Sequence, residues 1–239
     1  MKNALILLAG GVGKRFASKD PKQFLKIGCS NLIEYFLNNL DSRLFDIIII
    51  ATKPEFRKKY LDSIEKKFNQ HNLKFSISGN NRQITSKKSL NFLKKYNPVN
   101  VLIHDSARPL ANNTLIKRII NCLNKHDTCI PFTSFNDLIK LKKGKELDAT
   151  NIINIQTPQG FNFKKIHKAH NSLSNIDARD DSSILELQKQ KLKMIKGDIT
   201  NIKITSKSDL EYFNRLKLKE FRSGIGYDIH AINFNSKKN

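Results

Sequence analysis

Short apolar runs alternate with longer amphipathic stretches along most of the chain, and this alternation constrains the fold more than any other feature. Such runs are typical of strands buried on both faces, and the stretches between them have the spacing of surface helices. The pattern predicts an α/β fold: a mostly parallel, twisted sheet with helices on both faces. Strands are expected at residues 4–8, 46–51, 74–77, 101–104, 128–131, 192–195 and 202–205. Helices are expected at residues 31–40, 55–68, 85–96, 114–124, 163–172 and 181–190, with a last one starting at Ser206.

The stretch 132–156 does not follow this alternation. It contains two short apolar segments, and between them lies Lys142-Lys143-Gly144, a sequence typical of a turn. We therefore expect two extended segments that leave the main sheet as a protruding β-arm.

A glycine-rich turn follows the first predicted strand, and over residues 9–16 it reads A-G-G-V-G-K-R-F. Glycines let backbone N–H groups approach a polyphosphate without obstruction by a Cβ atom. The spacing matches neither the dinucleotide fingerprint nor the P-loop pattern. Arg15 in the turn and Lys22 shortly after it are cations that can clamp a triphosphate. The competing interpretation is a solvated basic loop in a lysine-rich protein.

A second group of polar residues follows the strand predicted at 101–104. Asp105 and Arg108 come at its carboxyl end, and this is the edge of an open parallel sheet where ligands bind. A single charged residue at a strand end is more often structural, but the pair together favours a site. Other polar segments that can reach the same edge are 79–85, 156–161, 180–183 and 201–205.

The charge of the chain is strongly positive, with 43 Lys+Arg against 21 Asp+Glu and a formal net charge of +22. Such an excess is typical of proteins that bind nucleic acid, anionic membranes or phosphorylated ligands. The basic residues are spread over the whole chain and do not gather with aromatic residues, so we interpret most of them as composition bias and expect no nucleic-acid partner.

Cysteine usage and hydropathy bear on the compartment. Cys29, Cys122 and Cys129 are odd in number and lack the C-x-x-C spacing, which fits a reducing compartment. No window approaches the roughly 18 apolar residues that a membrane span needs. We expect a cytoplasmic protein with no membrane partner.

Taken in order, the motifs resemble one family, the 2-C-methyl-D-erythritol 4-phosphate cytidylyltransferases, over about residues 3–220. The resemblance rests on the glycine turn with Arg15, Pro21-Lys22-Gln23, Arg82, His104-Asp105-x-Ala107-Arg108-Pro109, Thr157-Pro158-Gln159 and Asn201-Ile202-Lys203-x-Thr205. It implies a Rossmann-like nucleotidyltransferase fold and a homodimer joined through the arm. It also implies transfer of CMP from CTP, with Mg²⁺, to 2-C-methyl-D-erythritol 4-phosphate in non-mevalonate isoprenoid precursor biosynthesis.

The resemblance assigns roles residue by residue. It implies that Arg15 and Lys22 are catalytic and stabilise the five-coordinate phosphorus. It implies CTP contacts from Ala9, Gly10, Gly11, Gly79, Asn80 and Thr85. It implies polyol phosphate contacts from Asp105, Arg108, Thr157 and Lys203.

Some positions depart from the family pattern. Ala149 stands where the family has an arginine that reaches the substrate phosphate from the neighbouring subunit. The arm's Asp-Thr pair is replaced by Asp137-Leu138, or by Ser134-Phe135 if the loop is aligned without an insertion. Asn80 and Thr85 replace an aspartate and a serine. Two alternatives therefore stay open: a cytidylyltransferase for another polyol phosphate such as ribitol 5-phosphate, and an inactive remnant.

The C-terminal segment 222–230 resembles the opening strand of 2-C-methyl-D-erythritol 2,4-cyclodiphosphate synthase. In that family the Asp-x-His pair, here Asp228 and His230, ligates a divalent metal such as Zn²⁺. Two ligands do not complete a site, so we expect metal binding there only with a complete second domain. The expected organisation is a cytidylyltransferase domain over 1–220, with its dimerisation arm at 132–156, and the truncated start of a cyclodiphosphate synthase domain over 221–239.

Overall fold

The computed structural model describes residues 1–11, 21–26, 28–135, 137–144, 146–172, 178 and 180–217. Over these residues eight strands form one sheet in the order β10-β5-β9-β4-β1-β2-β3, with β8 paired to β5, while β6 and β7 form a separate hairpin. The strands are β1 (Asn3–Leu8), β2 (Ile47–Thr52), β3 (Leu73–Ile77), β4 (Asn100–Asp105), β5 (Thr128–Ser134), β6 (Ile139–Lys140), β7 (Glu146–Leu147), β8 (Ile153–Ile155), β9 (Gln159–Asn162) and β10 (Met194–Lys196).

The centre of the sheet is parallel, as the apolar runs predict. β1 lies between β2 and β4 and is parallel to both, β2 is parallel to β3, and β10 is parallel to β5. Every residue of β2 and β4 is buried. This explains why β2 is apolar over most of its length and why the centre of β4, Val101–Ile103, is a continuous apolar run without alternating polar residues.

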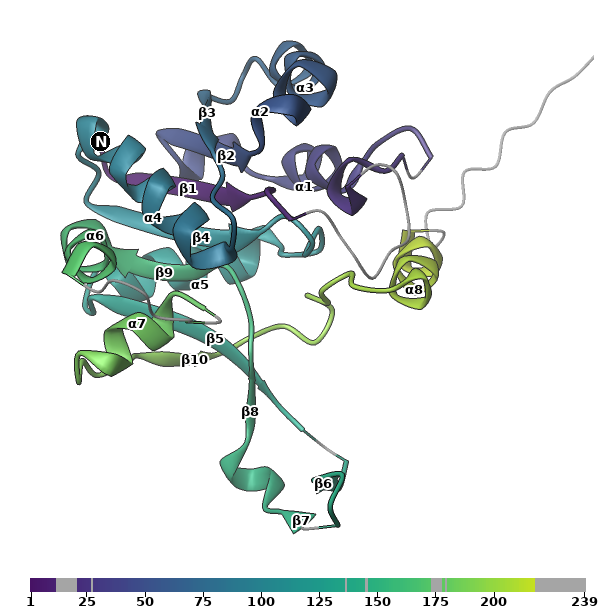
Figure 1. Cartoon of the computed structure of the whole chain (residues 1–239), viewed down its shortest axis with the longest axis vertical. Helices are drawn as coiled ribbons and strands as arrows, with labels where there is room; N and C mark the ends of the chain where they lie inside the picture. Colours follow the sequence, from purple (N-terminus) through teal and green to yellow (C-terminus); the bar gives the residue numbers. More distant parts are fainter. Residues whose placement is uncertain are drawn as a thin grey trace, which may run out of the picture.

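Helices cover both faces of the sheet, which confirms the predicted layers (Figure 1). One face packs against α1, α3 and α5, and the other packs against α4, α6 and α7. The helices are α1 (Leu32–Asn39), α2 (Pro54–Phe56), α3 (Asp62–Lys67), α4 (Arg82–Leu93), α5 (Asn113–Leu123), α6 (Phe163–Ser172), α7 (Ser182–Leu187) and α8 (Lys207–Lys217). A π-helical segment, Arg57–Leu61, joins α2 to α3.

Two parts of the sheet differ from the prediction. β9 was not predicted, and it lies antiparallel between β4 and β5. Its glycine, Gly160, packs so closely on α5 that a Cβ atom would lie 2.5 Å from the Ile119 side chain. Residues 202–205 were predicted as a strand, and this is wrong because the segment has no strand partner; its backbone is held instead by contacts such as Ile204 N donating to Ala107 O at 2.8 Å.

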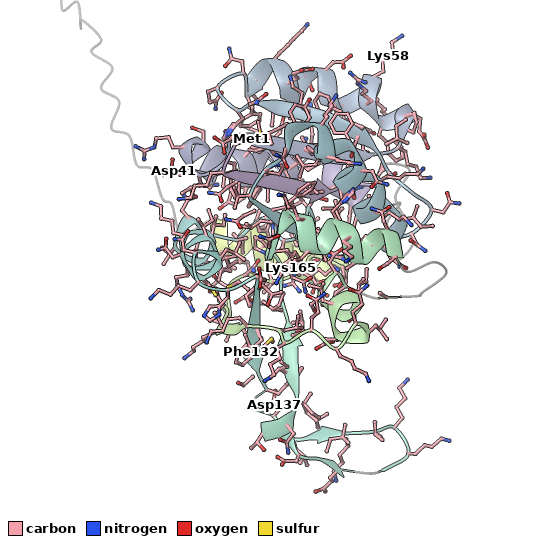
Figure 2. All side chains as sticks on the ribbon, turned by 90° about the vertical axis from the view of Figure 1, so that its left-hand side faces the viewer. Met1, Asp41, Lys58, Phe132, Asp137 and Lys165 are labelled. Carbon is pink, nitrogen blue, oxygen red and sulfur yellow. The ribbon has the colours of Figure 1, made fainter. Side chains whose placement is uncertain are left out.

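The predicted β-arm is confirmed. β5 continues to Ser134, β8 returns antiparallel to it, and the β6–β7 hairpin forms the tip. Figure 1 shows the arm leaving the body of the molecule, and Figure 2 places Phe132 where it emerges and Asp137 farther out. Four large apolar side chains of the arm are exposed: Phe135, Leu138, Leu141 and Ile153.

The last described helix, α8, packs against α1 through Phe213, whose ring meets Tyr35 edge-on with centroids 5.0 Å apart. The predicted start at Ser206 is confirmed, because Asp209 N donates to Ser206 Oγ at 3.2 Å while Ser206 N donates to Asp209 Oδ2 at 2.8 Å. Among the helices that the structure describes, none has the length and apolar character to cross a membrane.

Candidate active site

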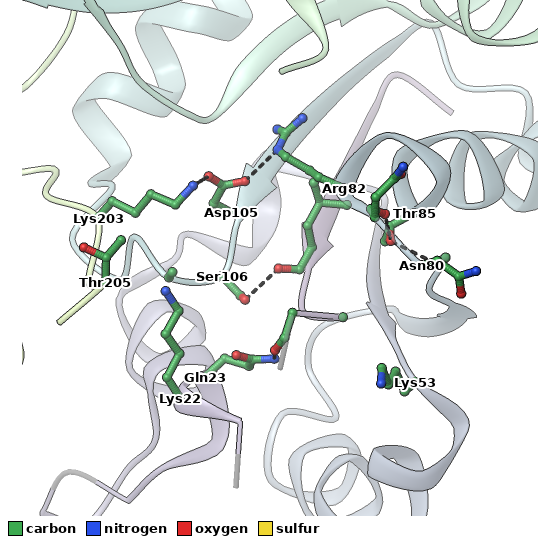
Figure 3. Close-up of a pocket in the computed structure, with 16 residues that line it drawn as sticks. Lys22, Gln23, Lys53, Asn80, Arg82, Thr85, Asp105, Ser106, Lys203 and Thr205 are labelled. Atoms are coloured by element: carbon green, nitrogen blue, oxygen red, sulfur yellow. Dashed lines mark hydrogen bonds and ion pairs between the residues drawn. The ribbon is translucent and has the colours of Figure 1, made fainter. Parts of the chain in front are cut away.

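A cavity of about 540 Å³ opens at the carboxyl edge of the parallel strands (Figure 3). Its walls come from the residues that follow β1, β2, β3 and β4, together with the segment before α8. The lining residues are Leu8, Gly10, Gly11, Lys22, Gln23, Lys53, Gly79, Asn80, Asn81, Arg82, Thr85, Asp105, Ser106, Ala107, Lys203 and Thr205. This is the edge where a parallel sheet of this kind places its ligands.

Most of the described residues that the sequence singled out meet in this cavity. Gly10, Gly11, Lys22, Gly79, Asn80, Thr85, Asp105 and Lys203 line it. Ala9, Arg108 and Thr157 do not line it. Arg15, Asp228 and His230 lie outside the described residues, so their roles stay predictions.

The glycine turn is held by the side chain of Gln23, which comes from the 3-10 helix Lys22–Phe24. Gln23 Nε2 donates to Ala9 O at 2.6 Å and to Gly11 O at 2.8 Å. Gly10 is required by close packing, because a Cβ atom there would lie 2.6 Å from Ser78 Oγ. The backbone of Ala9 is bonded within the protein, because its N–H donates to Ala51 O and its carbonyl accepts from Gln23, and its expected contact with CTP stays a prediction.

Thr157 does not line the cavity but is bonded to Asp105, and its expected contact with the polyol phosphate stays a prediction. The Thr157 hydroxyl accepts a hydrogen bond from Asp105 N at 3.0 Å and lies 3.0 Å from His104 Nδ1. Burial lowers the pKa of His104 to about 4, so the ring is neutral near pH 7. His104 Nε2 must donate to the carbonyl of Arg108, which leaves Nδ1 to accept from the Thr157 hydroxyl.

Arg108 does not line the cavity, and its expected contact with the polyol phosphate stays a prediction. Its guanidinium is buried, with Nη1 donating to Asn201 O at 2.7 Å and Nη2 to Ile155 O at 3.4 Å. Ile155 belongs to the base of the arm, and Asn201 begins the segment that carries Lys203. Arg108 therefore ties these two segments together in the described structure.

Asp105 is the one carboxylate among the described lining residues, and it stands between two cations. Lys203 Nζ lies 2.7 Å from Asp105 Oδ2, and Arg82 Nε lies 3.1 Å from Asp105 Oδ1. Burial alone would raise the pKa of Asp105, but the charges of Arg82 and Lys203 outweigh it and hold the pKa below its usual range.

The lining has an excess of positive charge. The described lining residues include one carboxylate, Asp105, and four cations: Lys22, Lys53, Arg82 and Lys203. A cavity with four cations and one anion is suited to a ligand that carries several negative charges, such as a polyphosphate or a sugar phosphate.

Sequence reasoning gave no role to several lining residues. Lys53 follows β2 at the same sheet edge as the glycine turn, and that position after a buried strand was the available signal. Ser106 secures the neighbouring strand ends, because its hydroxyl donates to Leu8 O at 2.7 Å. Gln23 belongs to a quoted motif, but its hydrogen bonds to the turn depend on tertiary geometry that no local pattern encodes.

The buried carboxylates make the stability of the fold sensitive to acid. Burial alone would raise the pKa of Asp181, but the charge of Arg82 and the hydrogen bond with His170 outweigh burial and lower the pKa to about 2. A carboxyl with a depressed pKa in the folded state stabilises the protein above its unfolded pKa of about 3.9, and this contribution is lost as the pH falls through the folded pKa. The free energy of unfolding should therefore decrease between about pH 4 and pH 2.

Urea unfolding at a series of pH values, at constant salt, measures this effect, with Asp181→Asn as the reference. The difference in free energy of unfolding between wild type and variant should shrink by about 2 kcal/mol as the pH falls from 4 to 2. If the free energies of unfolding of wild type and variant ran parallel over this pH range, the pKa of Asp181 would be the same in the folded and unfolded states.

The comparison with protein families agrees with this geometry. The family model described as 2-C-methyl-D-erythritol 4-phosphate cytidylyltransferase, or IspD, matches residues 3–215. The chain belongs to this family. The predicted fold is thereby confirmed as the Rossmann-like α/β fold of nucleotidyltransferases, and the predicted family is confirmed with it.

Relatives of the cytidylyltransferase family include fused and single-domain proteins. A protein named bifunctional enzyme IspD/IspF from Pelagibacter ubique is 34% identical over 244 residues, a match that covers 99% of this chain and 62% of the relative. A 2-C-methyl-D-erythritol 4-phosphate cytidylyltransferase from Clostridium tetani is 33% identical, with 87% of both chains covered. This chain thus spans about three fifths of the length of its bifunctional relatives.

Solved cytidylyltransferase structures share the fold. A 4-diphosphocytidyl-2C-methyl-D-erythritol synthase from Anaerococcus prevotii superposes with a TM-score of 0.78 at 26% identity, covering 92% of this chain and 96% of that one. The bifunctional IspDF from Campylobacter jejuni superposes with a TM-score of 0.74 at 30% identity, covering 88% of this chain and 54% of that one.

Proposed function

We propose that this chain transfers CMP from CTP to 2-C-methyl-D-erythritol 4-phosphate and releases pyrophosphate. The observation that carries the proposal is the cavity with four cations and one carboxylate, found at the carboxyl sheet edge of a member of this cytidylyltransferase family. Family membership favours this acceptor over ribitol 5-phosphate, and the names of the relatives agree with it.

The proposed reaction needs charge stabilisation more than a base. An oxygen of the acceptor phosphate attacks the α-phosphorus of CTP, a new P–O bond forms, and the bond to the β-phosphate breaks with pyrophosphate as the leaving group. The nucleophile is already an anion, so no side chain has to remove a proton. Lys22 lines the cavity and can stabilise the charge that builds on the five-coordinate phosphorus, together with Arg15 if the prediction for the glycine turn holds.

Two walls of the cavity suit the two substrates. The nucleotide side is formed by Gly10, Gly11, Gly79, Asn80 and Thr85, in keeping with the predicted CTP contacts. Lys203 and Asp105 lie together on the opposite side (Figure 3), where a polyol phosphate could offer its phosphate to the amine and its hydroxyls to the carboxylate.

We propose that Mg²⁺ enters this site on the nucleotide. The described residues gather no group of three His, Cys, Asp or Glu side chains able to hold a metal ion, and Asp105 is already shared by Arg82 and Lys203. Mg²⁺ keeps several water ligands and binds readily to phosphate oxygens. The residues therefore fit a Mg–CTP complex, in which the triphosphate supplies most of the ligands and the metal neutralises phosphate charge.

Pyrophosphate release tests the proposal directly. The protein is incubated with CTP and Mg²⁺, and methylerythritol 4-phosphate and ribitol 5-phosphate are offered in parallel. We expect release with methylerythritol 4-phosphate and formation of the cytidine diphosphate ester in equal amount. Release with ribitol 5-phosphate alone would contradict methylerythritol 4-phosphate as the acceptor. Release with neither compound would support the alternative that the protein is an inactive remnant.

We also propose that two copies of the chain associate through the arm. The support is the arm's exposed apolar side chains Phe135, Leu138, Leu141 and Ile153, because apolar side chains gathered on a projecting segment are typical of an interface. The division of the chain near residue 220 stays a prediction, since residues 218–239 lie outside the described part.

Substitution in the arm tests the proposed dimer. Leu138 is 67% exposed, and Leu138→Glu should shift the mass measured by light scattering from two chains toward one because it places a charge in the interface. Leu187 on α7 is 58% exposed, and Leu187→Glu is the matched control that should leave the mass unchanged. A wild-type mass of one chain at micromolar concentration would contradict the proposed dimer.

A further inference from the structure

A chain of charged side chains runs from the cavity into the interior of the molecule. Lys203 and Arg82 share the carboxylate of Asp105, as described above. On its other side, Arg82 Nη1 donates to Asp181 Oδ2 at 2.6 Å. Asp181 Oδ1 in turn lies 3.1 Å from His170 Nε2.

The inner end of this chain is fully buried. The side chains of Asp181 and His170 are 0% exposed, whereas that of Arg82 is 22% exposed and that of Lys203 is 41% exposed. Burying a charged group is costly unless it is paired, and a buried ion pair is often no more stabilising than apolar residues of the same size. Stability alone is therefore a weak reason for Asp181, and its contact with a cavity residue points to another role.

Arg82 is bound by two carboxylates at once, Asp181 and Asp105. The guanidinium presents Nε to Asp105 and Nη1 to Asp181, so each carboxylate receives a different edge of the same group. Without the negative charge of Asp181, the whole attraction of Arg82 would fall on Asp105. Arg82 would then compete with Lys203 for the same carboxylate, and the Lys203 amine would lose its fixed position.

We propose that Asp181, supported by His170, is a positioning residue that acts through Arg82 to hold Asp105 and Lys203 ready for the phosphorylated acceptor. This inference rests on the proposed function. Asp105 and Lys203 lie on one side of the cavity, and Asn80 and Lys53 lie on the other (Figure 3), so the effect falls on the acceptor and not on the nucleotide.

The first test compares two neighbouring aspartates in steady-state assays of pyrophosphate release. Asp181→Asn should raise the KM for methylerythritol 4-phosphate about tenfold, the equivalent of one hydrogen bond to a charged group, with the KM for CTP changed less than about twofold. Asp180→Asn is the matched control: Asp180 Oδ1 accepts from Ser183 N at the start of α7, and Gln159 Nε2 donates to Asp180 Oδ2 at 2.7 Å, but no contact with Arg82 is described. It should leave both KM values near those of wild type.

A double-mutant cycle shows whether Asp181 acts through Arg82. Arg82→Lys keeps the charge but cannot bond both carboxylates in the same way, and it should raise the KM for the acceptor on its own. Adding Asp181→Asn to Arg82→Lys should change that KM less than about twofold further, because the two side chains act as one unit. Asp181→Glu restores the charge and should recover part of the affinity that Asp181→Asn loses.

The outcomes separate this inference from the proposed function. Turnover by the wild-type protein tests the proposed function. The positioning role is tested separately, by the ratios of the variant KM values to those of wild type. An equal rise in both KM values, no rise in either, or independent effects of Arg82 and Asp181 would overturn the positioning role. Should Asp181→Asn fail to fold, as judged by circular dichroism, Asp181→Glu and Arg82→Lys each test the inference by the selective rise in the acceptor KM.

Discussion

Replacing Lys22 with alanine should lower kcat for pyrophosphate release by about 10²–10³, the usual cost of removing one charge contact to a transition state. Lys22 lines the cavity, and its position next to Gln23 ties it to the segment that holds the glycine turn. In the structure Lys22 Nζ donates to Ile204 O at 2.6 Å, so the amine is directed toward the segment that carries Lys203. The Lys22 amine is thus held on the side of the cavity where Lys203 and Thr205 lie (Figure 3).

The control for this substitution lies in the same segment. Lys26 is exposed and does not line the cavity, so Lys26→Ala removes the same charge from the protein without removing it from the site. Steady-state kinetics should show kcat near wild type for Lys26→Ala. Equal losses in the two variants would mean that net charge matters and that the position of Lys22 does not, which would contradict a catalytic role.

The parts of the fold that follow local patterns were predictable from the sequence. The helix expected at 163–172 is found as α6, Phe163–Ser172, because its apolar residues recur at helical spacing. β1 and β2 were found to within about one residue, since strands buried on both faces are apolar over nearly their whole length.

The parts that depend on distant partners were not predictable. β9 has no run of β-branched residues, and its strand character comes from hydrogen bonds to β4 and β5. The segment 202–205 has the alternation of a strand, but Arg108 and Lys22 satisfy part of its backbone and that of Asn201, so no neighbouring strand is needed. The β-propensity of a segment indicates that its residues suit an extended, half-buried backbone, but it does not indicate whether another strand lies beside that segment.

The same distinction holds within the site. A predicted strand end located Asp105, the family resemblance implied Lys203, and the structure brings the two together as an ion pair. The sequence could not show that the side chains of Arg108 and Thr157 are engaged elsewhere, because Arg108 bonds to the arm base and to Asn201, and Thr157 bonds to the end of β4. Motif matches identify positions near a site, but contacts decide which side chains face the ligand.

Asp105→Asn should have the largest combined effect on stability and activity. Asp105 is 8% exposed and accepts from both Arg82 and Lys203. An amide carries no charge and has one acceptor oxygen, so it would turn its N–H groups toward one of the two cations. We expect the free energy of unfolding to fall by about 2–4 kcal/mol. Turnover should fall by about a hundredfold, because the carboxylate and the Lys203 amine both lose their fixed positions.

A surface pair gives the reference for this substitution. Asp127 pairs with Lys165, and both side chains are about half exposed, at 50% and 52%. Asp127→Asn should cost less than about 1 kcal/mol because water screens the pair, and kcat should not change. Urea unfolding and steady-state kinetics on the two variants therefore separate burial from charge. If both substitutions had the same small effect, the charges around Asp105 would be as well screened as those on the surface, and the cavity would lack the low-dielectric setting that the proposed catalysis requires.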